Sequence, residues 1–169
     1  IKNRTLGYDG KGQVLIKTQD DINKHFLGKT LFPSIAEEVI SFDRELSVII
    51  VRNKEGNIKT FEPGENVHES GILVTTTLPS PTSEALKNAA ITIARKIVAD
   101  LDYIGVMGVE FFLKDSVLYV NEIAPRVHNS GHWTMDGSYS SQFQQHIRAI
   151  MDLPLLSTER HSDIIMYNL

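Results

Sequence analysis

Apolar residues along the chain fall into short alternating runs that predict a β-rich fold. The segment 45–52 (ELSVIIVR) is rich in β-branched residues and is the strongest strand signal. A turn with the sequence KEGN joins it to 58–61, which predicts a hairpin. A second hairpin is predicted between 106–113 and 117–120. The same reasoning predicts further strands at 13–17, 34–40, 72–78 and 164–166.

Three other segments have helical signals. Residues 83–101 and 142–151 carry apolar side chains every three to four positions, which predicts two amphipathic helices. A short helix is predicted to begin after Thr18, a good N-cap residue, and to run to about residue 27. Strands, a helix, a hairpin and another helix in this order predict an α+β fold, an antiparallel sheet with helices on one face.

Composition narrows the classes of protein. The chain has 169 residues, of which 41% are hydrophobic and 22% charged, enough for one domain with a sizeable core. A net charge of −4 does not suggest nucleic-acid binding. There is no cysteine, hence no disulfide or thiolate metal site, which fits a reducing compartment such as the cytoplasm. No apolar run approaches the roughly 20 residues of a membrane helix, so no membrane association is expected.

Both ends of the chain suggest a piece of a longer protein. The sequence starts at Ile1 without a methionine or a signal-peptide pattern, and it stops within an apolar run, DIIMYNL. We therefore expect further segments outside these 169 residues.

A glycine-rich segment, GYDGKGQ at 7–13, is the first candidate for binding chemistry. Its three glycines allow backbone N–H groups to turn towards an anion, and Lys2, Arg4 and Lys11 add positive charge. The segment is not a Walker A loop, because the spacing before the lysine is wrong and no Ser or Thr follows the lysine. A plain surface turn is the alternative interpretation.

An acidic segment, EEVI at 37–40, is the second candidate. An extended backbone beside Val39 and Ile40 is suited to hold an adenine, and a carboxylate such as Glu45 is suited to bind ribose hydroxyls. On its own, the segment is better explained as the acidic edge of a strand.

Two glutamates on the second predicted hairpin are the third candidate. Glu110 lies within VEFF, and burying an unpaired carboxylate is costly, which favours a metal or a cation as its partner. A three-residue loop would place Glu122 opposite Glu110, whereas a two-residue loop would place Asn121 there. Paired carboxylates suit Mg²⁺, which often shares oxygen ligands with substrate phosphates. The alternative is an exposed glutamate on the solvent face.

The polar run RVHNSGHW follows the hairpin and is the fourth candidate. Arg126 offers a planar fork for an oxyanion, and His128 can donate a hydrogen bond or move a proton. Asn129 and Ser130 add neutral hydrogen bonds. A transition-metal pair of His128 and His132 would need a helix, which the neighbouring proline and glycine disfavour. Packing explains His132 and Trp133 equally well, and His68 alone is most simply a loop histidine.

These motifs together resemble one family. YDGKGQ, VEFF, NEIAPRVHNSGHW, SQFQQHIRAI and DLPL, in this order, resemble the ATP-grasp part of the 5-(carboxyamino)imidazole ribonucleotide synthases. The resemblance runs over essentially the whole chain. It implies an ATP-grasp fold, with 1–42 as the end of the small subdomain and 43–169 as the large subdomain with the metal site.

The resemblance also implies a reaction. ATP would phosphorylate bicarbonate to carboxyphosphate, and the exocyclic amine of 5-aminoimidazole ribonucleotide would then be carboxylated, in purine biosynthesis. ATP and Mg²⁺ are the implied cofactors, and the full-length protein is expected to be a homodimer. A short-lived carboxyphosphate requires a site that excludes water and holds the amine beside it.

Roles are implied residue by residue. Asp9, Arg126 and His128 are the implied catalytic residues, Asp9 for the proton of the attacking amine. Glu110 and Glu122 are the implied metal ligands. Residues expected to face the ribonucleotide or bicarbonate are Tyr8, Asp9, Lys11, Arg126, His128, Asn129 and Ser130. Residues expected to contact ATP are Lys2, Gly7, Tyr8, Asp9, Gly10, Lys11, Gly12, Gln13, Glu37, Glu38, Val39, Ile40, Glu45, His68, Asn121 and Glu122.

The chain departs from the pattern in two positions and in extent. Ala124 stands where many ATP-grasp enzymes have an asparagine, so Glu110 and Glu122 are expected to hold the metal with less help. Val39 replaces a smaller residue of the adenine segment. The N-terminal α/β domain and a basic C-terminal segment of the family are not in these 169 residues, so this chain alone is expected not to turn over.

Two alternatives remain open. One is a different ATP-grasp ligase, such as a glycinamide ribonucleotide synthetase or a biotin-dependent carboxylase, although the RVHNSGH run argues against both. The other is a nucleotide-binding fragment without activity. This alternative is supported by the expectation that these 169 residues are a piece of a longer protein.

Overall fold

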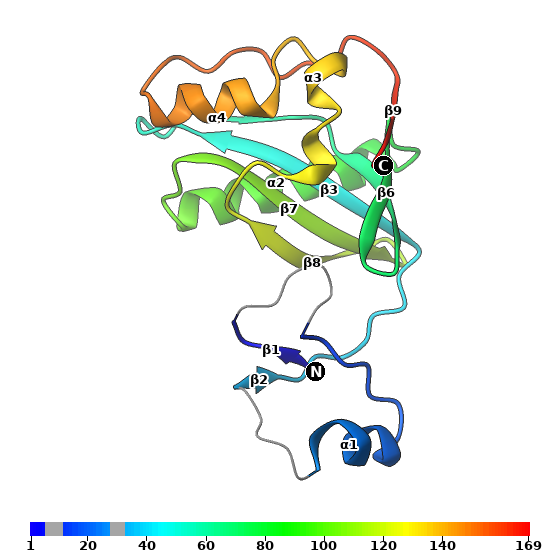
Figure 1. Cartoon of the computed structure of the whole chain (residues 1–169). Helices are drawn as coiled ribbons and strands as arrows, with labels where there is room; N and C mark the ends of the chain where they lie inside the picture. The colour runs from blue at the N-terminus through cyan, green and yellow to red at the C-terminus, as the bar shows by residue number, and fades with distance from the viewer. Residues whose placement is uncertain (6–11, 28–32) are drawn as a thin grey trace. The chain divides into compact units, whose positions relative to one another are not determined.

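The chain forms two compact units in a computed structural model that describes residues 1–5, 12–27 and 33–169 (Figure 1). The first unit consists of Ile1–Ile40 and Glu69–Ile72. The second consists of Ser41–His68 and Leu73–Leu169, and it contains the two hydrophobic core clusters that the described residues form.

The described residues of the first unit form two short strands and one helix. Strand β1 (Lys2–Asn3) pairs antiparallel with β2 (Ser34–Ile35), and helix α1 is Gln19–Phe26. The predicted start of α1 is confirmed. Asp21 N–H donates to the Thr18 hydroxyl, and Thr18 N–H donates to the Asp21 carboxylate, which together form a capping box.

The strands predicted in this unit are wrong or too long. Within 13–17 only Gln13 forms a bridge, with Lys2, and within 34–40 only the two residues of β2 pair. Apolar alternation predicts a strand only where one face is buried. Here Leu15 is 52% exposed and Val39 is 63% exposed, so the apolar residues gain little from a regular ladder.

The second unit is built around a seven-stranded sheet in the order β8-β7-β3-β5-β6-β9, with β4 paired to β3 as well. Strand β3 is antiparallel to β4, β5 and β7. The sequence predicted every strand except β5, and β8 is longer than expected. The bounds are β3 Arg44–Arg52, β4 Ile58–Thr60, β5 Gly64–Glu69, β6 Ile72–Leu78, β7 Gly105–Lys114, β8 Val117–Ala124 and β9 Ile164–Tyr167.

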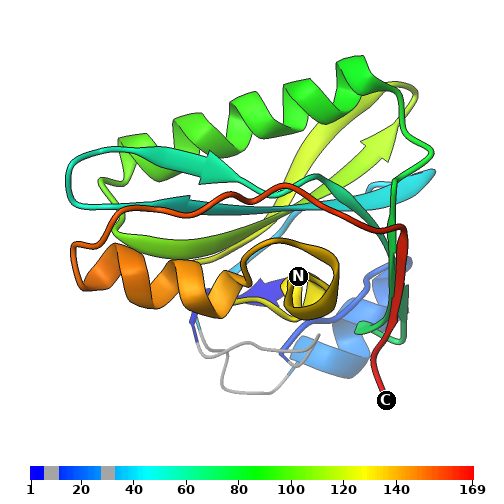
Figure 2. The same cartoon turned by 90° about the horizontal axis from the view of Figure 1, so that it is seen from above.

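Helices cover both faces of this sheet, so the expectation of helices on one face is wrong (Figure 2). Helix α2 (Glu84–Asp100) lies on one face, and α3 (Thr134–Gly137) and α4 (Gln142–Ile150) lie on the other. A short 3₁₀ helix, η1 (Asn129–Gly131), precedes α3. None of the helices in the described ranges is long and apolar enough to span a bilayer.

Strand β3 shows why two helical layers are needed. Leu46, Val48 and Ile50 pack with Ala90, Ala94 and Val98 of α2 in one core cluster. The alternate residues Ile49 and Val51 pack with Trp133 and Ala149 in a second cluster on the opposite face. A strand that is apolar on both faces is buried only when both faces are covered. The pattern 45–52 therefore indicates a central strand.

The second face changes character along β3. Side chains of one strand alternate, so Glu45 and Ser47 share the face of Ile49 and Val51. The face is thus apolar beneath α4 and polar towards the start of β3. This polar half is where the functional candidates of the second unit gather.

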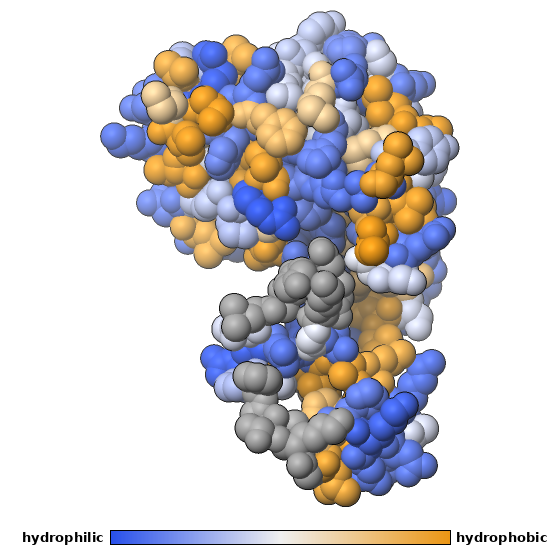
Figure 3. Space-filling view, viewed as in Figure 1, coloured by the Kyte–Doolittle hydropathy of each residue, from blue (hydrophilic) through white to orange (hydrophobic). Residues whose placement is uncertain are grey.

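The outward side of α4 keeps several apolar residues in contact with solvent (Figure 3). Ile147 is 55% exposed and Ile150 is 51% exposed. The inward side holds Gln142, Gln145 and Ala149. The helix therefore buries two amides while it exposes two isoleucines, the reverse of the usual pattern.

Candidate functional site

The β7–β8 hairpin places Glu110 and Glu122 directly opposite each other. Its turn consists of Asp115 and Ser116, both with positive φ, as a two-residue type I′ turn requires. With a regular ladder this turn would place Asn121 opposite Glu110. A β-bulge shifts the register between Glu110 and Phe111, so Asn121 is the extra residue and Glu122 takes the opposite position.

Glu110 is the central carboxylate of the site. Its side chain is only 14% exposed, and burial raises its pKa above the ordinary glutamate value, with repulsion from Glu122 and Glu45 adding to the effect. His68 and a hydrogen bond with Asn121 act in the opposite direction. A buried carboxylate with these neighbours is suited to a cationic ligand.

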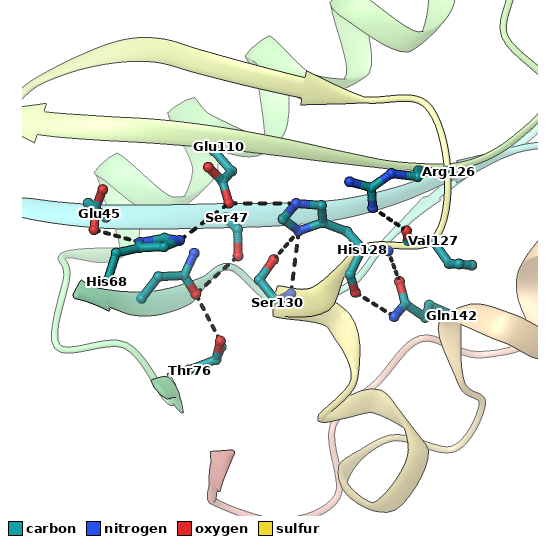
Figure 4. Close-up of polar contacts among 11 residues, drawn as sticks. Glu45, Ser47, His68, Thr76, Glu110, Arg126, Val127, His128, Ser130 and Gln142 are labelled. Atoms are coloured by element: carbon teal, nitrogen blue, oxygen red, sulfur yellow. Dashed lines mark hydrogen bonds and ion pairs between the residues drawn. The ribbon is translucent and has the colours of Figure 1, made fainter. Parts of the chain in front are cut away.

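His68 joins two of the carboxylates. Its Nδ1 lies 2.7 Å from Oε2 of Glu45, and its Nε2 lies 3.9 Å from Oε1 of Glu110 (Figure 4). The hydrogen bond to Glu45 is the main reason why the pKa of His68 is raised. His68 lies on β5, so the interpretation of this residue as a loop histidine is wrong.

His128 reaches Glu110 from the other side. Its Nε2 lies 3.7 Å from Oε1 of Glu110, and its Nδ1 lies 2.8 Å from the Ser130 hydroxyl (Figure 4). The backbone N–H of Ser130 also donates to Nδ1. A backbone N–H can only donate, so we assign Nδ1 as the acceptor and place the ring proton on Nε2. His128 thus presents an N–H donor beside Glu110.

The ring of His128 is neutral at physiological pH. Burial lowers its pKa to about 4, and the positive charge of Arg126 contributes to the same shift. Arg126 is exposed and donates to the carbonyl of Val127 through Nη1, which leaves other guanidinium N–H groups for a ligand. The segment 126–128 therefore offers a neutral hydrogen-bond donor, His128, and a positively charged donor, Arg126.

The low pKa of His128 predicts a loss of stability in mild acid. The unfolded chain takes up a proton near pH 6.5, whereas the folded chain resists it until about pH 4, so unfolding is favoured as pH falls through this window. The loss attributable to His128 is about 3 kcal/mol at pH 4. Urea unfolding at several pH values, for wild type and His128→Gln, measures it. Equal pH slopes in the two proteins would contradict the assignment.

A buried hydrogen-bonded group under the site was not predicted from the sequence. The side-chain oxygen of Asn66 accepts from the hydroxyls of Ser47 at 3.4 Å and Thr76 at 3.0 Å (Figure 4). Asn66 is two residues before His68 and Ser47 is two residues after Glu45, a spacing that could have indicated a common face. Nδ2 of Asn66 is buried and has no hydrogen-bond partner among the described residues.

An aromatic pair lies next to this polar face. Phe112 pairs with Glu45 across β7 and β3, and its ring stacks on Phe42 with ring centroids 4.3 Å apart. The pair was also missed from the sequence, because Phe42 precedes the strand. Trp133, by contrast, packs edge-to-face on Phe61 and is 4% exposed, so its packing interpretation is confirmed.

The candidates in the first unit form a small group of their own. Lys2 makes an ion pair of 2.8 Å with Glu37 and a bridge with Gln13. Gly12 has a φ of +78°, and a Cβ there would lie 2.9 Å from Asn3 Nδ2, so this position favours glycine. Glu38 and Val39 are exposed. The predicted site residues Gly7, Tyr8, Asp9, Gly10 and Lys11 lie outside the described residues.

The second unit brings together most of its predicted site residues. Glu45, His68 and Glu110 are linked by the contacts given above, and Glu122 is close enough to perturb the pKa of both His68 and Glu110. Asn129 is half-buried and Ser130 is buried in η1. The site therefore has an acidic side on the hairpin and a donor side at 126–130.

The carboxylates of the hairpin suit a Mg²⁺ ion that takes its remaining ligands from water and substrate phosphates. Glu110 and Glu122 offer carboxylate oxygens from opposite positions, and Asn121 lies beside them. Within the described ranges, no group of three or more His, Asp or Glu side chains is arranged to hold a metal ion. Mg²⁺ commonly takes one or two carboxylates and completes its shell with water and substrate phosphates. The two glutamates fit that pattern.

Comparison with known proteins identifies the class. The ATP-grasp domain model matches residues 1–143, and the chain belongs to the ATP-grasp family. The antiparallel sheet with its helices and the expected ATP-grasp fold are thereby confirmed.

Within this class, the chain is similar to one kind of enzyme. It is 51% identical to the N5-carboxyaminoimidazole ribonucleotide synthase of Brucella melitensis, over 100% of the chain and 48% of that protein. Carboxyaminoimidazole ribonucleotide synthase of Aspergillus clavatus, solved with ATP, has a TM-score of 0.92 at 39% identity, over 99% of this chain and 44% of that one. A structure from the same species with ADP and 5-aminoimidazole ribonucleotide has a TM-score of 0.86 at 38% identity, covering 94% and 43%. The resemblance predicted from the sequence is confirmed, and the chain spans about half the length of these relatives.

Proposed function

We propose that the protein carboxylates the amine of 5-aminoimidazole ribonucleotide with bicarbonate at the expense of ATP. One observation carries this proposal. Glu110 faces Glu122 across the hairpin and also lies 3.7 Å from Nε2 of His128. An acidic pair suited to a metal nucleotide and a donor segment suited to a small oxyanion thus meet at one side chain. The relatives named above, which include structures with ATP, ADP and the ribonucleotide, support it.

ATP would lie over the acidic side. Glu110 and Glu122 would hold Mg²⁺, which neutralises phosphate charge and aligns the phosphates for in-line transfer when it is bound. His68 and Asn121 would contact the nucleotide. Since Oε2 of Glu45 is bonded to His68, its other oxygen is available for a ribose hydroxyl. From the resemblance of the sequence, we also propose that 37–40 contact adenine and that Lys2 and 7–13 contact the phosphates.

Bicarbonate would lie on the donor side. Arg126, His128, Asn129 and Ser130 would hold its oxygens, with the neutral His128 donating through Nε2–H. A bicarbonate oxygen attacks the γ-phosphorus, and the bond from phosphorus to ADP breaks, which gives carboxyphosphate. The amine nitrogen then attacks the carbonyl carbon, phosphate leaves, and the amine proton passes to a base. Asp9 is our proposal for that base.

The two compact units of the chain support a proposal about its subdomains. We propose that 1–42 is the end of the small ATP-grasp subdomain and that 43–169 is the large subdomain. The clustering of the chain into Ile1–Ile40 and the bulk of the remainder supports this division. Limited proteolysis followed by mass spectrometry tests it, since cleavage is expected first near 40–43.

Two properties of the whole protein are also proposals. We propose a homodimer in the cytoplasm, as expected from the family. Light scattering on the full-length protein tests the first property, and a monomer at micromolar concentration would contradict it. Cell fractionation tests the second.

A coupled assay tests the reaction itself. The full-length protein is expected to release ADP only when Mg·ATP, bicarbonate and 5-aminoimidazole ribonucleotide are all present. ADP release that depends on a different amine or on biotin would favour another ATP-grasp ligase. Calorimetry with Mg·ATP distinguishes an inert chain, which should show no metal-dependent binding.

A further inference from the structure

Two glutamines of α4 are fully buried, which is unusual for polar side chains on a short helix. Gln142 and Gln145 are each 0% exposed. A buried amide is costly unless its oxygen and its N–H groups find partners. The partners of the two amides therefore indicate why this helix carries glutamine rather than leucine at these positions.

Gln142 is bonded to the main chain of one residue. Its Oε1 accepts from the N–H of His128 at 2.9 Å, and its Nε2 donates to the carbonyl of His128 at 2.7 Å (Figure 4). The amide thus pairs with His128 as a neighbouring strand would. Gln142 is itself held, because its N–H donates to the Thr134 hydroxyl, which donates to the carbonyl of Gly131.

The ring of His128 is held by a separate contact. A Cβ at Gly108 would lie 2.8 Å from both Cβ and Cγ of His128, so the imidazole packs against the bare backbone of β7. Gly108 is two residues before Glu110, on the same face of the strand. Main chain and ring are thus fixed from two sides, and Nε2 is presented towards Glu110.

We propose that Gln142 is a positioning residue for the bicarbonate site. It holds the main chain of His128 so that the Nε2–H donor meets the anion beside Glu110. The segment 125–128 belongs to neither a strand nor a helix, so the paired amide takes the place of a ladder. Misplacing such a donor weakens the binding of a small anion more than the binding of a large nucleotide with many contacts. This inference rests on the proposed function.

Gln145 provides a matched control. Its Oε1 accepts from the N–H of Leu156, and its Nε2 donates to the carbonyl of Leu156 and to the Ser140 hydroxyl. The same amide, equally buried and one turn further along α4, thus pairs with a segment that holds no proposed site residue. A stabilising role alone would give the two glutamines the same phenotype.

Gln142→Met and Gln145→Met in the full-length protein distinguish positioning from general stability. Kinetics would be compared per folded molecule, with bicarbonate and ATP varied separately. Gln142→Met is expected to raise the KM for bicarbonate by about 10- to 100-fold, a range typical of residues that orient a ligand-binding side chain, with the KM for ATP unchanged. Gln145→Met is expected to lower stability and to leave both KM values unchanged.

Gly108→Ala is the second variant, because its Cβ displaces the imidazole while the amide of Gln142 is unchanged. It is expected to raise the KM for bicarbonate selectively as well, and it decides the matter if Gln142→Met does not fold. An unchanged KM for bicarbonate in Gln142→Met, or parallel changes in both KM values in the two methionine variants, would overturn the inference. A wild-type protein without bicarbonate-dependent turnover would instead overturn the proposed function.

Discussion

Glu110→Gln in the full-length protein is expected to lower ATP-dependent turnover by about 10²- to 10³-fold, the loss that follows removal of one preorganised electrostatic group. The unliganded variant is expected to be at least as stable as wild type. Burial raises the pKa of Glu110, so the folded state disfavours its ionised form and loses stability as pH rises through the folded pKa. Glutamine removes that cost. Turnover and the urea midpoint at pH 7.5 measure the two effects.

Glu62→Gln is the matched control, for which we expect lower stability and unchanged turnover. Glu62 lies 2.8 Å from Arg160 and 3.8 Å from Lys87, away from the proposed site residues. Losing this partly buried pairing is expected to cost about 1 kcal/mol of unfolding free energy with no change in turnover per folded molecule. A Glu110→Gln protein that is less stable and still active would show that Glu110 has a structural role instead.

Arg126→Lys is expected to lower kcat/KM for bicarbonate by about 100-fold, with binding of Mg·ATP unchanged. Lysine keeps the positive charge but lacks the planar fork that holds two oxygens of an oxyanion. Arg126 is exposed, and among the described residues its guanidinium donates only to the neighbouring Val127 carbonyl, so its replacement is expected to change stability little. Steady-state kinetics with bicarbonate varied and calorimetry with Mg·ATP provide the measurement.

Arg95→Lys is the control for that substitution. Arg95 is exposed on α2, which covers the opposite face of the sheet. The change is expected to have no effect on kinetics or nucleotide binding. If Arg126→Lys behaves like this control, the donor side of the site does not use a guanidinium fork.

The three longer helices were predictable because their signals are local, whereas the four-residue helix α3 was not predicted. Ser83 and Thr18 cap α2 and α1 as expected, and α4 starts within a capping box at Ser141. The strand β5 was missed because its inward residues are Gly64, Asn66 and His68. They line the polar half of the face, so apolar alternation could not indicate them. A strand whose inward side chains line a polar site lacks the alternation of apolar and polar residues from which strands are predicted.

The register of the second hairpin shows another limit. Both loop lengths considered from the sequence were compatible with the residues, and the pairing of Glu110 with Glu122 arises from a two-residue turn combined with a bulge at Asn121. A bulge depends on the twist of neighbouring strands and on what a site requires, not on the local sequence. The two glutamates were predictable as candidates, but their arrangement was not.

Isotope transfer from bicarbonate to phosphate tests whether the enzyme forms carboxyphosphate. The full-length protein would be supplied with ¹⁸O-labelled bicarbonate, Mg·ATP and 5-aminoimidazole ribonucleotide, and the released phosphate would be analysed by mass spectrometry. The bicarbonate oxygen that attacks phosphorus stays on phosphorus when the amine displaces phosphate. We expect released phosphate to carry ¹⁸O in step with carboxylation. Unlabelled phosphate accompanying carboxylated product would contradict a carboxyphosphate formed beside Glu110 and His128.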